Sequence, residues 1–190
     1  MVDRWHQFVF TSSLVALSWL LMMAVHEFGH VLGAIVTGGS VERIVLHPLA
    51  ISRTDVLPNP HPSLVVWLGP IVGCVLPLLV ATILPSNRIE FRNIAKFFAG
   101  FCLVANGVYI SIGAFDRVGD CGVMLATGSP YWSLLAFGAA TIPLGLFVWH
   151  KIGSVGEFSN HPEMVTPRLA YTTAALMIAI AGLEFCLSPR

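Results

Sequence analysis

The sequence predicts an all-α polytopic membrane protein with about five transmembrane helices and a short membrane-associated β-hairpin after the first. Three observations predict this fold class. Hydrophobic residues make up 56% of the 190 residues and charged residues only 11%, whereas a soluble domain usually carries about 25% charged residues. Apolar stretches of about 20 residues, the length that spans a bilayer, recur along the chain. A β-type stretch too short and polar to span follows the first of them.

The charge balance and the cysteines exclude several other classes. Lys+Arg and Asp+Glu both number 10, so nothing in the charge suggests nucleic acid as a partner. The four cysteines stand singly, with no CxxC pair, which favours small buried hydrophobes over a disulfide framework. The first apolar segment is too long for a signal-peptide core and shows no clear cleavage site, so we expect it to be retained. We therefore expect one domain, 1–190, embedded in the lipid bilayer as a multi-pass protein.

Five segments have the length and composition of transmembrane helices. The first carries two histidines in its second half, and the third contains an asparagine. In the second, Gly69-Pro70 most simply marks a kink, with neighbouring groups satisfying the freed backbone. The expected bounds of the five helices are about 8–36, 64–84, 94–115, 131–149 and 169–187.

The stretch 40–52 reads as two short β-type runs broken near His47-Pro48,. We expect an edge hairpin that lies against the membrane or dips into it, packed on protein or lining a wet cavity, because exposed non-helical backbone is not tolerated in lipid. A proline-stiffened connector that contains His61 follows. His47 and His61 are candidate additional metal ligands, although a loop histidine is more often simply solvated.

The first helix contains His26-Glu27-Phe28-Gly29-His30. Histidines four residues apart share one face of an α-helix, because a turn takes 3.6 residues. Neutral imidazoles at this spacing can bind one zinc ion (Zn2+), and the adjacent glutamate can take a proton from a water held there. A chance match leaves three ionisable side chains unexplained in a hydrophobic helix, where they are costly. The motif predicts His26 and His30 as metal ligands and Glu27 as the catalytic base.

The third protein ligand is a choice between two aspartates. Two histidines and a water leave one protein position on a tetrahedral catalytic zinc, and a carboxylate is a common occupant. Asp116 and Asp120 both lie at the end of the third helix, where a helix terminus can deliver an oxygen to the first helix. Asp116 precedes Arg117 and fits a solvated ion pair, whereas nearby glycines let the backbone at Asp120 approach closely. We favour Asp120 and keep Asp116 as the alternative.

Asn106 is a full amide inside the otherwise apolar third helix. One interpretation is an interhelical hydrogen bond, which is common in membrane bundles. The other is a contact to an extended substrate backbone, since an amide both donates and accepts hydrogen bonds. Both interpretations stay open, and we carry Asn106 forward as the candidate substrate-binding residue.

These residues resemble the site-2 protease family of intramembrane zinc metalloproteases. His26-Glu27-Phe28-Gly29-His30 matches the family's HExxH in a membrane helix. Residues 67–73 are similar to its Gly-Pro motif in the next helix, with Gly73 where many members have asparagine. Residues 120–125 look like the Asp-Gly-Gly-x-x-Leu stretch that supplies the third ligand, with Cys121 in place of the first glycine.

The resemblance covers about residues 15–126, and it implies a function. A family member would use zinc to hydrolyse a peptide bond in a locally unwound transmembrane protein substrate. A regulatory membrane partner is compatible with this function. It would have a three-helix catalytic core at 8–126, two accessory transmembrane helices at 127–190, and a hairpin at 40–52 that receives the substrate. Two alternatives remain: a membrane zinc hydrolase of a lipid or small amide, and a non-catalytic membrane assembly factor. An intact Glu27 argues against the second, because structural zinc needs no base.

Overall fold

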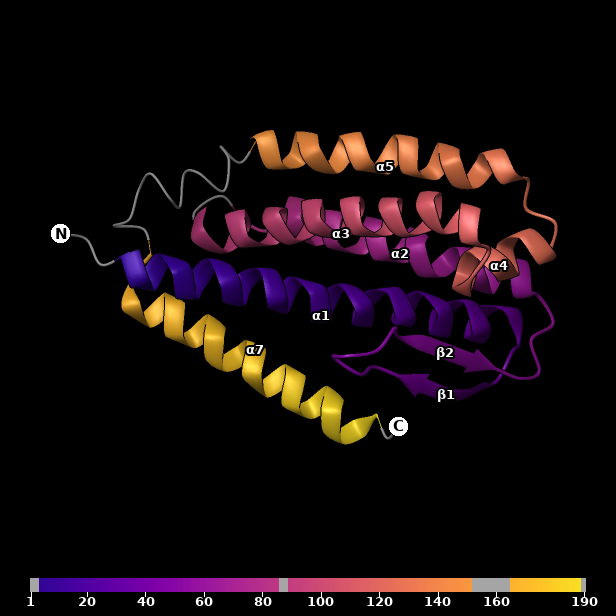
Figure 1. Cartoon of the computed structure of the whole chain (residues 1–190), viewed down its shortest axis with the longest axis horizontal. Helices are drawn as coiled ribbons and strands as arrows, with labels where there is room; N and C mark the ends of the chain where they lie inside the picture. Colours follow the sequence, from indigo (N-terminus) through magenta and orange to yellow (C-terminus); the bar gives the residue numbers. More distant parts are fainter. Residues whose placement is uncertain (1–3, 86–88, 152–164, 189–190) are drawn as a thin grey trace.

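The computed structural model describes residues 4–85, 89–151 and 165–188 (Figure 1). This part of the chain contains six helices and one two-stranded antiparallel sheet. Five of the helices are long and apolar enough to cross a membrane. The predicted fold class, a multi-pass integral membrane protein with a hairpin after the first helix, is therefore confirmed. The five long helices are α1 Arg4–Thr37, α2 Pro62–Ile83, α3 Ile89–Asp116, α5 Tyr131–Lys151 and α7 Pro167–Leu187.

Helix α1 occupies the middle of the bundle (Figure 1). It packs on α2 along one side and on α7 along the other, while α3 packs on α2 and α5. At 34 residues, α1 is roughly 51 Å long, because an α-helix rises about 1.5 Å per residue. The hairpin and the short helix α4 lie toward its C-terminal end (Figure 1). The chain leaves α1 at Gly38, where φ is +76°, a conformation that glycine adopts at little cost.

The hairpin consists of β1 Val41–Val45 and β2 Arg53–Val56, paired antiparallel. The strands are joined by a loop over 46–52, so the second β-type run predicted after His47-Pro48 is wrong in position: the second strand begins only at Arg53. This loop is attached to the end of α7. The Ser188 hydroxyl accepts a hydrogen bond from the Leu46 N–H and donates one to the Leu46 carbonyl, each at 2.8 Å. The buried ring of His47 lies 5.1 Å from the Phe185 ring. The last transmembrane helix therefore holds the hairpin loop in place.

Helix α4, Gly119–Ala126, is a separate short helix that follows α3. The expected position of Asp120 at the end of the third helix is therefore slightly wrong. Helix α3 stops at Asp116, the chain reverses through Arg117 and Gly119, both with positive φ, and Asp120 lies in the first turn of α4. Buried side chains from four helices fix α4 against the bundle: Val66, Ile110, Ala114, Cys121, Met124 and Leu134.

Candidate metal centre

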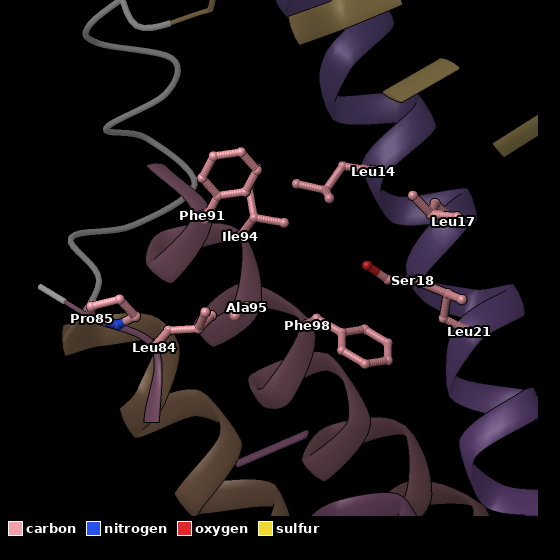
Figure 2. Close-up of a pocket in the computed structure, with 10 residues that line it drawn as sticks. All are labelled: Leu14, Leu17, Ser18, Leu21, Leu84, Pro85, Phe91, Ile94, Ala95 and Phe98. Atoms are coloured by element: carbon pink, nitrogen blue, oxygen red, sulfur yellow. The ribbon is translucent and has the colours of Figure 1, made fainter. Parts of the chain in front are cut away.

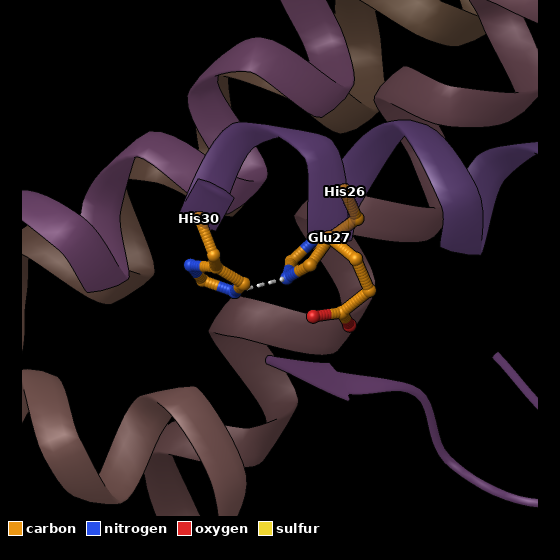
Figure 3. A group of neighbouring side chains, drawn as sticks. All are labelled: His26, Glu27 and His30. Atoms are coloured by element: carbon orange, nitrogen blue, oxygen red, sulfur yellow. Dashed lines mark hydrogen bonds between the residues drawn. The ribbon is translucent and has the colours of Figure 1, made fainter. Parts of the chain in front are cut away.

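His26, Glu27 and His30 are all buried on α1 (Figure 3). One ligand atom from each of the three lies within 4.8 Å of the others. The two Nε2 atoms face each other at 3.1 Å, so the imidazoles share one face of the helix as the i, i+4 spacing predicts.

Hydrogen bonds at the far side of each ring fix the histidine tautomers. The Asn106 amide nitrogen donates to the Cys102 carbonyl at 2.9 Å, which turns its carbonyl oxygen to His26 Nδ1 at 2.6 Å. That oxygen can only accept, so His26 carries its hydrogen on Nδ1. His30 Nδ1 donates in the same way to the Val65 carbonyl of α2 at 2.9 Å. With that hydrogen on Nδ1, each ring has its Nε2 available to bind a cation in the space between them, which is the arrangement of metal-binding histidines,.

Asp120 joins the two histidines in that space. Its Oδ2 lies 2.8 Å from His26 Nε2 and 3.3 Å from His30 Nε2. Two imidazole nitrogens and one carboxylate oxygen therefore converge, and this donor set fits zinc,. Asp116, the alternative, is exposed at the end of α3.

Glu27 makes a different contact. Its Oε2 accepts a hydrogen bond of 2.7 Å from the hydroxyl of Thr54 on strand β2. The carboxylate is thus held beside the histidines by the hairpin.

A cavity of about 510 Å³ opens onto this cluster, a size within the range of small-ligand sites. His26, Glu27, Asn106, Tyr109 and Asp120 line its polar end, and the hairpin loop 48–52 forms one wall. The remaining walls are mostly apolar and come from α1, α3 and the loop: Trp19, Met22, Met23, Leu49, Ile51 and Ala105.

A second cavity of about 410 Å³ lies nearer the start of α1, between α1, the end of α2 and α3 (Figure 2). Of the described residues that line it, none has an ionisable side chain, and Ser18 is the one with a polar side chain. The chemistry-bearing residues therefore gather at the first cavity.

Several residues at the site escaped the sequence interpretation. Gly69, taken as part of a kink, faces a metal-ligand candidate: a Cβ at this position would lie 2.5 Å from His30 Nε2. The signal for this role in the sequence was the Gly-Pro pair, which is similar to the family's motif. The Val65 carbonyl, Thr54 and Tyr109 carry no local sequence signal. Neither loop histidine joins the cluster among the described residues, since His47 packs on Phe185 and His61 is the exposed N-cap of α2.

The buried HExxH helix inside a bundle of membrane-spanning helices defines the class of protein, a membrane-embedded metalloprotease. Residues 5–112 match the family described as Peptidase M50B-like, and the chain belongs to this family. The predicted relationship to site-2 proteases is confirmed. Searches of curated proteins and of solved structures returned no match. The matched range ends before Asp120, so the case for that residue is geometric.

Proposed function

We propose that the protein is a zinc-dependent intramembrane endopeptidase that hydrolyses a peptide bond in a locally unwound transmembrane segment. One observation carries the proposal: two histidines with their protons directed away from each other converge with Asp120 on one point, next to Glu27. His26, His30 and Asp120 would hold the zinc ion. The family membership supports protein substrates.

Each group at the site has a separate role in the proposed reaction. A bound zinc ion would supply Lewis-acid polarisation of the scissile carbonyl and of the attacking water. Glu27 takes the proton of that water and delivers it to the amine that leaves. Asn106 holds His26 in the tautomer that exposes Nε2. Because Asn106 also lines the cavity, its predicted contact to the substrate remains a prediction.

The hairpin supports capture of an extended substrate. A transmembrane helix satisfies its own backbone hydrogen bonds, so a segment must unwind before it can be cut. The described sheet has two strands, and each strand of such a sheet has one unpaired edge, on which an extended peptide can add as a further strand. The Thr54–Glu27 hydrogen bond places this sheet next to the proposed base. The apolar walls of the cavity suit the side chains of a membrane segment.

The test is cleavage of a defined transmembrane substrate by the purified protein in detergent or liposomes. We expect cleavage that chelation stops and added zinc restores. Glu27→Gln should bind zinc normally and lower kcat by about 10²- to 10⁴-fold, the usual contribution of a general base. Asp116→Asn, which changes an exposed carboxylate at the end of α3 that does not line the cavity, is the matched control. Activity that survives both Glu27→Gln and chelation would refute the mechanism, and turnover of lipids or small amides alone would favour the alternative hydrolase.

A further inference from the structure

We propose that Tyr109 is a further catalytic residue of this site, whose hydroxyl donates a hydrogen bond to the scissile carbonyl oxygen as negative charge develops on it. The proposal rests on the proposed function. It adds, beside the Lewis acid and the base, a hydrogen-bond donor from the protein for the developing oxyanion.

The position of Tyr109 on α3 directs it toward the cluster. It follows Asn106 by three residues, so the two side chains lie on one face of the helix. Its ring stands edge-on to the His26 ring, with centroids 5.8 Å apart. Tyr109 lines the same cavity as Glu27 and Asp120, which places the phenol at the polar end where a substrate carbonyl would approach.

The hydrogen bonds of the hydroxyl leave its proton free. The oxygen accepts the Asp120 N–H at 3.2 Å, and a phenol has one hydrogen to donate besides. Among the described residues, no acceptor takes that hydrogen. The two carboxylates that line the cavity can only accept hydrogen bonds when ionised, so they cannot stabilise an oxyanion. Two other residues with donor groups line the cavity, Ser52 and Asn106. Ser52 belongs to the hairpin loop, and the Asn106 amide is already bonded to Cys102 and His26, whereas the Tyr109 hydroxyl stands on a packed helix.

The start of α4 is shaped around this hydroxyl. Gly119 adopts φ +56°, and a Cβ there would lie 2.5 Å from the phenol oxygen. The next residue, Asp120, then carries its carboxylate to both histidines. One short segment thus fixes the hydroxyl relative to the ligand cluster, which is the pre-organisation that makes an oxyanion donor effective.

The experiment compares Tyr109→Phe with wild type, and uses Tyr131→Phe as the matched control. Tyr131 lies at the start of α5 against Phe115 and does not line the cavity. For Tyr109→Phe we expect kcat to fall about 10²- to 10³-fold, the usual loss of one oxyanion donor, with KM within about twofold and zinc content unchanged. A peptide phosphinate, which mimics the tetrahedral oxyanion, should bind the variant at least about tenfold more weakly, while the unmodified peptide binds both proteins alike.

Two results overturn the role of Tyr109. A Tyr109→Phe protein with a kcat within about threefold of wild type would show that Tyr109 does not donate to the oxyanion. A loss of zinc in the same variant would show that the hydroxyl only positions Asp120 through its N–H. These results are distinct from a failure of the proposed function, in which wild type and Tyr131→Phe also cleave no peptide. In that case the role proposed for Tyr109 fails together with the proposed function.

Discussion

Replacing Gly69 by alanine tests whether the α2 backbone sets the position of His30. The added Cβ would lie 2.5 Å from His30 Nε2, and the three atoms nearest to it all belong to that imidazole. Relief therefore comes from movement of the ring rather than from separation of the helices. We expect Gly69→Ala to fold normally and to lose its metal.

The size of the effect follows from the geometry. Ordinary van der Waals contact begins at 3.4 Å, so the ring must recede by about 1 Å. Metal–ligand distances tolerate deviations of about 0.2 Å, and a misplacement of about 1 Å in an active site can cost 10²-fold in rate. We therefore expect zinc affinity and kcat/KM each to fall by about 10²-fold or more.

The assay measures zinc per protein by mass spectrometry, with helix content by circular dichroism and peptide cleavage in parallel. Gly182→Ala is the matched control, because a Cβ at this position in α7 meets nothing within 4 Å and alanine favours the helix by about 1 kcal/mol. A Gly69→Ala protein that keeps its full zinc content and activity would refute the reasoning. Equal damage in both variants would show a general effect on helices instead.

Two further predictions concern neighbouring contacts. A Cβ at Gly73 would lie 2.9 Å from the Asn106 amide nitrogen, so we expect Gly73→Asn and Asn106→Ala each to lower kcat/KM. The double variant should recover part of the activity, because the new asparagine supplies the amide from α2. A double variant no more active than the single variants in cleavage assays contradicts this exchange. Ser188→Ala removes both hydrogen bonds to Leu46, each worth about 0.5–1.5 kcal/mol, so hydrogen exchange of the hairpin loop should accelerate and KM rise while zinc content holds. Unchanged exchange at Leu46 would rule out that attachment.

The sequence was informative wherever a feature is local. The HExxH spacing, the apolar lengths of the helices and the first β-type run each depend on residues within one element, and the structure contains them. The second run was wrong in position, because residues 49–52 are loop and the second strand is Arg53–Val56. The partner of His26 could not be found in this way, since Asn106 lies 80 positions away. Similarity to a family motif directed attention to Asp120, but the choice over Asp116 depends on a chain reversal.

That reversal could not be predicted from local propensity. Arg117 adopts φ 54°, a conformation uncommon for residues other than glycine. Its cost is offset by tertiary packing of α4, including Cys121 against α3. A backbone acceptor such as the Val65 carbonyl is likewise invisible to residue identity, because every residue has one. The remaining site contacts therefore required the arrangement of the helices.

The length of α1 bears on how water reaches the reaction. A helix of about 51 Å exceeds a hydrocarbon thickness of about 30 Å, so it must tilt or emerge from the bilayer. If α1 is centred and upright, about 10 Å projects at each end, and His26, 22 residues after Arg4, lies roughly 8 Å inside the boundary nearer the hairpin. Each peptide bond cut consumes one water molecule. On this geometry the supply route is short and opens on the same side as the hairpin, so hydration and substrate delivery share one entrance.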